Sequence, residues 1–168
     1  MHNKLRGLCA ALLLWLPAAA QALPDDHNQP INISADRASI NERTGITVYT
    51  GNVEIRQGSM LIKGARVELH RQGNGVSRII STGSPAEFHQ QPEADAAPTR
   101  AYGLRMDYQV NRQEVTITES ARVDQGQDSF SGERIVYNME KAVVNAFGSD
   151  DANGERVRMV IQPRTDSN

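Results

Sequence analysis

One segment of this 168-residue chain is repeated 68 positions later. Residues 50–58 (TGNVEIRQG) align with residues 118–126 (TESARVDQG), and at the same offset Gly64 meets Gly132 and Arg66 meets Arg134. Both copies alternate apolar and polar side chains, which places the apolar set on one face of a β-sheet. A single repeat of this kind cannot bury its apolar face alone, so neighbouring copies stack and share one interior. The repeat therefore predicts a stack of β units with a continuous apolar interior.

Period-two apolar patterns recur along the rest of the chain. They predict short strands over residues 31–35, 46–49, 53–55, 60–62, 67–69, 106–110, 115–117, 121–123, 135–137 and 157–161. Turn residues separate these segments at intervals of about 8–12 residues, which is typical of a β-sandwich or barrel. Gly51-Asn52 is a turn pair and predicts a break between two strands.

Only the stretch Glu133–Phe147 has a spacing that a helix could also adopt. Its apolar residues are mostly β-branched or aromatic, and its repeat partner contains Gly73-Asn74-Gly75, which disfavours a helix. We therefore expect two hairpins, with turns near residues 72–75 and 138–141. The fold class predicted is all-β, with no long helix.

The first 22 residues have the features of a secretory signal peptide. Lys4 and Arg6 precede the apolar run Leu8–Ala20, which is too short to span a bilayer, and Ala20-Gln21-Ala22 is a small-x-small cleavage site. We expect a removed signal over residues 1–22, a β domain over 23–163 and a flexible tail over 164–168. An uncleaved membrane anchor is the alternative interpretation. Cys9 is the only Cys and would leave with the signal, so the exported domain would hold no disulfide.

Charge and motif content exclude several classes of function. The net charge is −2 at pH 7 and no basic run occurs, which disfavours nucleic acid as a partner. The sequence lacks a nucleophile elbow, a phosphate-binding loop and a zinc-protease motif, and its exported His residues (His27, His70 and His89) are scattered. We therefore expect no catalytic residues, no metal and no cofactor.

The apolar set on the repeated strands is the candidate binding site. Aromatic residues make up only 5% of the chain, so Ile, Val, Leu and Met dominate the interior, and such side chains suit flexible alkyl chains. The alternative is an ordinary sandwich core that is full and dry, which periodicity alone cannot distinguish. The repeat phase predicts that the interior is lined by Val53, Ile55 and Ile62 in one copy and by Ala121, Val123 and Phe130 in the other.

The two ends of the predicted stack carry strand edges. Residues 31–35 and 157–161 would be terminal strands, and little Lys or Pro blunts their unpaired backbone groups. A free edge can pair with a strand of another molecule. Pairing of the first edge with the last edge of another copy is a heterologous contact that builds open rods. The alternative is that both edges are covered within the monomer.

Several segments closely resemble the OstA-like, or LptA, family of lipopolysaccharide export proteins. The resemblance lies in residues 29–36 (QPINISAD), 50–53 (TGNV), 83–88 (GSPAEF) and 132–137 (GERIVY), and it extends over essentially the whole chain after the signal. It implies a periplasmic protein with an open, slightly twisted β-jellyroll of two antiparallel sheets arranged as a V. It further implies lipid-contact positions at Ile31, Phe88, Tyr108 and Val110. Ile33 is added because it shares the face of Ile31.

The same resemblance implies partners and an activity. Members assemble head to tail and link LptC at the inner membrane to LptD at the outer membrane, and lipopolysaccharide passes with its acyl chains inside the groove. A purely structural β scaffold and an LptC-like periplasmic domain, which would keep an N-terminal anchor, remain the alternatives.

Overall fold

A computed structural model describes residues 26–91, 96–150 and 154–163. The predicted signal peptide (1–22) and tail (164–168) lie outside these ranges. The described residues form ten strands and two short 3-10 turns: η1(Asp26–Asn28), β1(Asn32–Ser34), β2(Arg37–Asn41), β3(Ile46–Gln57), β4(Met60–Gln72), β5(Gly75–Gln90), β6(Thr99–Gln109), η2(Val110–Arg112), β7(Glu114–Gln125), β8(Asp128–Asn138), β9(Val143–Phe147) and β10(Arg158–Val160). Within them, no helix has the length and apolarity needed to cross a membrane.

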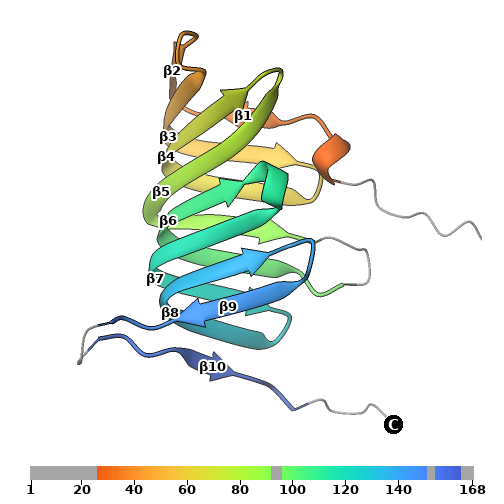
Figure 1. The fold of residues 1–168 in the computed structure, drawn as a ribbon, viewed down its shortest axis with the longest axis vertical. Coiled ribbons are helices and arrows are strands. Elements are labelled where there is room, and N and C mark those ends of the chain that lie inside the picture. The colour runs from red at the N-terminus through yellow and green to blue at the C-terminus, as the bar shows by residue number, and fades with distance from the viewer. Residues whose placement is uncertain (1–25, 92–95, 151–153, 164–168) are drawn as a thin grey trace, which may run out of the picture.

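All strand pairs are antiparallel, and hydrogen bonds join the ten strands into one sheet. The long strands follow the chain order from β3 to β8. At one end β1 and β2 both pair with β3, and at the other end β9 and β10 both pair with β8. Figure 1 shows this stack, with the N-terminal strands at the top and the C-terminal strands at the bottom. Each end of the sheet is therefore an edge built from two short strands.

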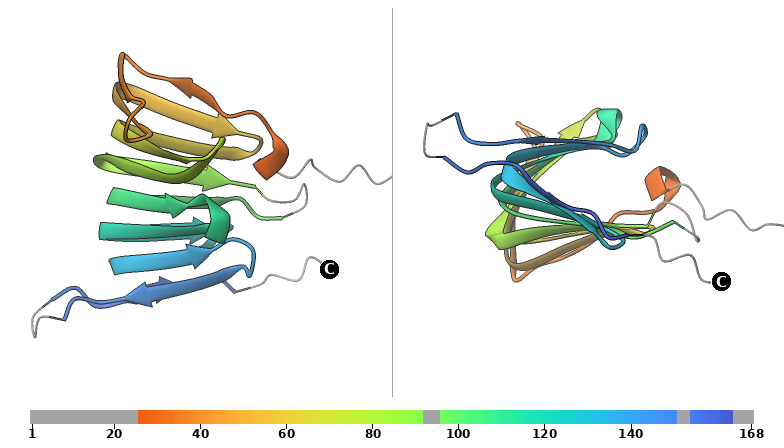
Figure 2. Two further views of the ribbon diagram at one scale, coloured as in Figure 1. Left: turned by 45° about the horizontal axis from the view of Figure 1, so that its top comes forward. Right: turned by 90° about the horizontal axis from the view of Figure 1, so that it is seen from below.

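Irregular positions bend every long strand near its middle. The register shifts between Thr50 and Val53 in β3, between Thr82 and Ala86 in β5, and at matching places in the other pairs. Seen along the stack, the strands trace an open V (Figure 2, right). The prediction of an all-β, open jellyroll is confirmed, and its two predicted layers are the two arms of the same bent strands.

Residues at equivalent positions of the sequence repeat also pair in the same strand register. β3 and β7 each contain twelve residues, and the pair Val53–Gly64 recurs as Ala121–Gly132. The prediction of a turn at Gly51-Asn52 is wrong, because these residues form a bulge inside the continuous strand β3. Their φ angles are +80° and +45°. The same bulge recurs at Glu119-Ser120, with φ angles of +63° and +60°, although neither residue is a glycine.

The repeat also includes strands that sequence comparison does not reveal. The pair Ile33–Ile55 between β1 and β3 recurs as Ala101–Val123 between β6 and β7. The pair Arg37–Thr50, between β2 and β3, recurs as Arg105–Thr118. β6 is thus the continuous counterpart of β1 and β2. β2 was not predicted, since its residues are all exposed and only Ala38 and Ile40 are apolar.

Both predicted hairpins are confirmed. β4 ends at Gln72 and β5 begins at Gly75, while β8 ends at Asn138 and β9 begins at Val143. Val110 was predicted within a strand, which is wrong: β6 ends at Gln109 and Val110 begins η2, where Gln113 has a left-handed conformation that turns the chain into β7. The strands form most of the interior, and Val110 of η2 and Met139 of the β8–β9 turn also pack against it.

Candidate functional site: the apolar interior and its end edges

All ten predicted lipid-binding residues belong to one apolar cluster between the arms. Six of them are buried: Val53, Ile55, Ile62, Phe88, Tyr108 and Val123. The remaining four pack against that cluster while staying partly exposed: Ile31, Ile33, Val110 and Phe130. The strand alternation brings these side chains to the inside of the V, as the repeat phase predicts. Their contact with a lipid stays a prediction.

The middle of the interior is filled by the protein's own side chains. Phe88 lies on one arm and Tyr108 on the other, and their ring centroids are 6.3 Å apart with the planes tilted by 54°. Both side chains have at most 1% of their surface exposed. Offset and tilted ring pairs of this kind are attractive. A ligand can therefore reach these residues only when the arms separate.

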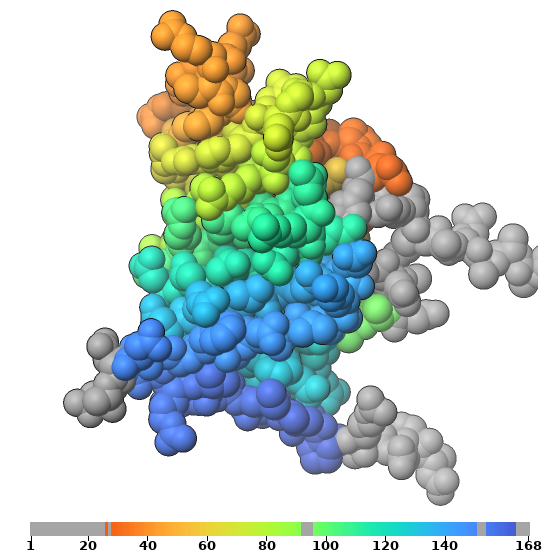
Figure 3. Space-filling view, viewed as in Figure 1, coloured from red at the N-terminus to blue at the C-terminus, as the bar shows by residue number. Residues whose placement is uncertain are grey.

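At the two ends of the stack the same apolar face is uncovered. Ile40 of β2 is 69% exposed, and Met159 of β10 is 54% exposed. Met159 pairs with Phe130, whose side chain packs on the core, so Met159 also faces the inside of the V. Figure 3 shows that the two edges lie at opposite ends of the molecule. Ile40 and Met159 therefore leave apolar surface exposed to water at the two ends of the stack.

Sequence reasoning missed several residues of this interior. Tyr49, Val76 and Met139 pack against the cluster, as do Val144 and Ala146 of β9. Val144 and Ala146 lie in the segment whose spacing was ambiguous between helix and strand. Period-two counting over residues 143–147 is the signal that could have found them.

Charged side chains pair along the outer face of the sheet. Arg56 Nε donates to Glu54 Oε1 at 2.6 Å, and Arg66 Nη2 donates to Glu68 Oε1 at 2.9 Å. The hydrogen bond from Arg66 lowers the pKa of Glu68 below its ordinary value of 4.5. Asp107 accepts two hydrogen bonds from Arg78 and thereby raises the pKa of that guanidinium. Exposed pairs of this kind each contribute little to stability, and they keep the outer face polar.

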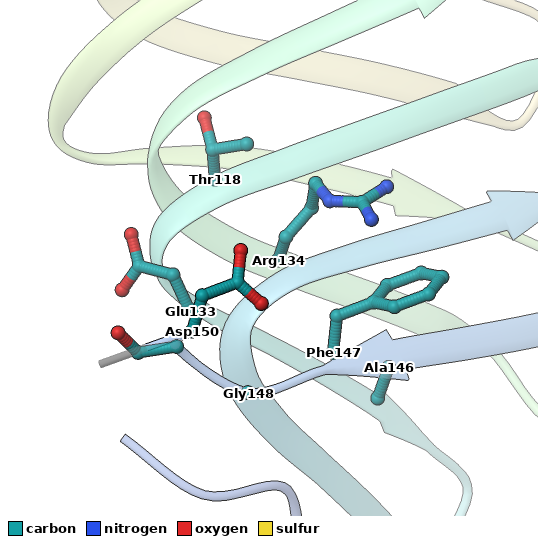
Figure 4. Close-up of a pocket in the computed structure, with 8 residues that line it drawn as sticks. Thr118, Glu133, Arg134, Ala146, Phe147, Gly148 and Asp150 are labelled. Atoms are coloured by element: carbon teal, nitrogen blue, oxygen red, sulfur yellow. The ribbon is translucent and has the colours of Figure 1, made fainter. Parts of the chain in front are cut away.

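A polar pocket lies on the outer side of the bend, next to the C-terminal edge (Figure 4). Glu133 and Asp150 both line this pocket. The guanidinium carbon of Arg134 is 3.8 Å from the ring centroid of Phe147, a cation–π contact. This pocket was not predicted, because its residues come from three separate segments of the chain.

The described residues offer no metal site. No group of three or more His, Cys, Asp or Glu side chains among them could hold an ion. His70 and His89 each lie beside one carboxylate, with Nε2 at 3.7 Å from Glu68 Oε2 and 3.2 Å from Glu87 Oε2. Each histidine therefore has a single carboxylate neighbour rather than a set of metal ligands.

Together these features define a class of protein: an open β-jellyroll of bent antiparallel strands with an apolar interior that reaches both end edges. Residues 32–143 match the family model described as "LptA/(LptD N-terminal domain) LPS transport protein". The chain belongs to this LptA-type family of lipopolysaccharide transport proteins.

Relatives and a solved structure agree with this family. The chain is 39% identical over 163 residues to lipopolysaccharide export system protein LptH of Pseudomonas aeruginosa, with 94% of this chain and 91% of that protein covered. It is 30% identical to lipopolysaccharide export system protein LptA of Escherichia coli K12, covering 92% and 82%. The crystal structure of Pseudomonas aeruginosa LptH, titled the LptA-homologous periplasmic component of the lipopolysaccharide transport device, matches with a TM-score of 0.77 and 38% identity. That match covers 83% of this chain and all of that one.

Proposed function

We propose that this protein is a periplasmic bridge subunit that carries lipopolysaccharide from the inner to the outer membrane. Copies assemble head to tail, with LptC as the partner at the inner membrane and LptD at the outer membrane. In this proposal residues 1–22 direct export and are removed. A mature N-terminus at Leu23 would argue against an anchored LptC-like domain. The observation that carries the proposal is an apolar interior that continues to both end edges, in a chain that belongs to the LptA-type family.

Physical chemistry explains why such a bridge needs no catalysis. Moving an acyl chain through water costs about 0.8 kcal/mol for each exposed CH₂ group. A continuous apolar groove lowers that cost at every step, while the sugars stay in water beside the polar outer face. A passive groove cannot set a direction by itself, so direction must come from an energy source elsewhere in the transport system.

The filled interior adds one step to the proposal. Phe88 and Tyr108 meet across the arms, so the arms must separate before acyl chains can replace these contacts. The incoming chains bury the same apolar surface that opening exposes, and this exchange keeps the net cost of opening low. A scaffold whose interior never opens is the competing proposal, and the buried aromatic pair is the observation that favours it.

Photo-crosslinking in cells tests lipid binding. A photoreactive residue at Ile31 or Phe88 should give lipopolysaccharide adducts, because both side chains face the interior. The matched control is Arg56, which lies on the outer face of β3 with more than half of its side chain exposed. We expect adducts at the interior positions and none at Arg56. Equal labelling on both faces, or no labelling at Ile31 and Phe88 in a folded protein, would favour the closed scaffold.

A further inference from the structure

The free end of one arm carries a row of uncharged polar residues on its inner face. Gln57, Gln90, Thr99 and Gln125 are the terminal residues of β3, β5, β6 and β7 at this end, and we call them the polar row. Each continues the inward phase of the buried apolar residues on its own strand. Gln90 pairs with Thr99, and Thr99 pairs with Gln125. The row therefore crosses neighbouring strands where the arm ends.

The free end of the other arm is apolar on its inner face. Val76, Val110 and Met139 lie there and pack against the apolar cluster. The free ends of both arms lie on the open side of the V (Figure 2, right). The opening thus has one polar side and one apolar side. A lipid whose acyl chains lie between the arms would pass its sugar end through this opening, beside the polar row.

Two atoms of the polar row are buried without a partner. Thr99 is 1% exposed and Gln90 is 8% exposed. In the described part of the chain, Thr99 Oγ1 and Gln90 Oε1 have no hydrogen-bond partner. Gln90 Nε2 donates to Asp26 Oδ2 at 3.3 Å, so only the oxygen of this amide lacks a partner. A buried polar atom of this kind lowers the stability of the folded state.

The fold itself does not require a hydroxyl at position 99. Asn32 pairs with Arg56 as Arg100 pairs with Asp124, so Ile31 is the counterpart of Thr99 in the repeat. Ile31 packs against the apolar cluster. A β-branched apolar side chain is therefore accommodated at this place in one copy of the repeat. The other copy has a hydroxyl that finds no partner inside the monomer, which indicates a partner outside it.

We propose that Thr99 and Gln90 bind the carbonyl, amide and hydroxyl groups at the sugar end of the acyl chains. This inference rests on the proposed function and specifies which part of the lipid is recognised. The Thr99 hydroxyl donates to an ester or amide carbonyl, and Gln90 Oε1 accepts from an amide N–H or a hydroxyl. These lipid groups are uncharged, as are the residues of the polar row. Contact follows separation of the arms, as it does for Phe88 and Tyr108.

The polar row would then give the interior selectivity among lipids. The apolar cluster binds any alkyl chain, because burial of CH₂ groups does not depend on what the chain is attached to. A lipid without carbonyl, amide or hydroxyl groups near its head leaves Thr99 Oγ1 and Gln90 Oε1 unpaired. Sites built to hydrogen-bond a ligand discriminate against analogues that lack the bonding group.

Thr99→Val tests the inference, because it keeps the shape of the side chain and removes the hydroxyl. The full chain is produced with its own leader and purified from a periplasm. Competition against a fluorescent fatty acid measures the affinities for lipid A and for dihexadecyl phosphate, which has two alkyl chains but no carbonyl, amide or hydroxyl on them. We expect about three- to tenfold weaker binding of lipid A and unchanged binding of dihexadecyl phosphate. The unfolding temperature should stay the same or rise.

Thr47→Val is the matched control, since Thr47 is a buried threonine on the inner face of the other arm. It should leave the ratio of the two affinities unchanged. Gln90→Met removes the amide oxygen at similar side-chain length and should also weaken lipid A binding selectively. This second variant keeps the test valid if Thr99→Val does not fold.

Three results for Thr99→Val would overturn the inference: unchanged affinity for lipid A, equal weakening for both lipids, or a lower unfolding temperature. The last would mean that the hydroxyl has a structural role in the monomer. A parent chain that binds neither lipid would instead overturn the proposed function. Failure of the polar row and failure of lipid binding are therefore distinguished by the parent chain alone.

Discussion

At the scale of the residue, charged side chains lie on the outer face of the sheet and most apolar side chains lie on its inner face. Most buried positions of β3 to β8 hold Ile, Val, Leu, Met, Ala and a few aromatic residues. The buried polar residues of these strands are Thr47, Gln57, Ser81, Gln90 and Thr99. The outward positions hold ion pairs between residues two apart on one strand. An example is Arg122 Nε with Asp124 Oδ1 at 2.9 Å. Such exposed pairs stabilise weakly, so their effect is visible mainly in the pH dependence of stability.

Glu68→Gln tests this effect. Because the folded pKa of Glu68 lies below its ordinary value, ionised Glu68 contributes stability above pH 4.5, and this contribution is lost as the pH falls through the folded pKa. The side chain is one-third exposed, so we expect a loss of less than about 1 kcal/mol at pH 7 and a smaller stability difference between pH 7 and pH 3. Urea unfolding at both pH values measures it. Glu42→Gln, at an exposed turn, is the control, and an unchanged pH dependence in Glu68→Gln would contradict the assignment.

At the scale of the element, the bulges make a jellyroll from strands that could otherwise form a flat sheet. A bulge adds an unpaired residue, bends the strand and increases its twist. Here the bulges recur in register across the sheet, so all strands bend along one line and the sheet folds into a V. The left-handed backbone at these positions favours glycine, which is present at Gly51 but not at its counterpart Glu119.

Substitutions at the two bulges should have opposite effects. Glu119→Gly should stabilise the fold by about 1 kcal/mol, because a left-handed conformation is strained for a residue with a Cβ. Gly51→Ala should destabilise it by at least about 1–2 kcal/mol, because its Cβ would lie 2.2 Å from Asp36 Oδ2 and would carry the same strain. Thermal unfolding measures both changes. Glu114→Gly, in a regular part of β7, should destabilise, and a loss of stability in Glu119→Gly would contradict the role of the bulge.

At the scale of the whole molecule, the arms and the end edges of the V-shaped sheet give it two different features. The arms enclose an apolar interior, and the split edges leave that interior open at the ends. Long strands with free edges normally risk indiscriminate pairing. Here each edge consists of two short strands set at an angle, so only a partner with the same bend can pair along both arms. Another copy of this chain has that bend.

Ile40→Lys should weaken self-association without unfolding the monomer. The side chain is 69% exposed in the single molecule, so the lysine stays in water there, but its ammonium would be desolvated at the apolar junction. Sedimentation velocity over a range of concentrations should show open-ended growth for the parent chain and a monomer for the variant. Ser39→Lys places the same charge on the outer face of β2 and should still associate. Unchanged association of Ile40→Lys would exclude this edge from the junction.

The sequence alone predicted the all-β class, the repeat, both hairpins and the inward phase of Val53, Ile55, Val123 and their neighbours. These features depend on the alternation of apolar and polar residues and on turn residues, and both can be read within a single segment of the sequence. It misread Gly51-Asn52 as a turn, because a turn and a bulge need the same left-handed backbone. Only the register of the partner strand, which continues past the bulge, distinguishes them.

The tertiary structure decided what the interior is and where it ends. Whether Phe88 and Tyr108 meet across the arms depends on how sharply the strands bend, and no local pattern records that angle. β2 carries almost no apolar signal, yet pairing with β3 makes it the counterpart of half of β6. The sequence by itself determined which face of each strand is apolar, since side-chain chemistry and period two suffice for that. The sequence also predicted terminal strands at residues 31–35 and 157–161, but only the structure placed β2 beside β1 at one edge and β9 beside β10 at the other, because these pairings join segments that are distant in the sequence.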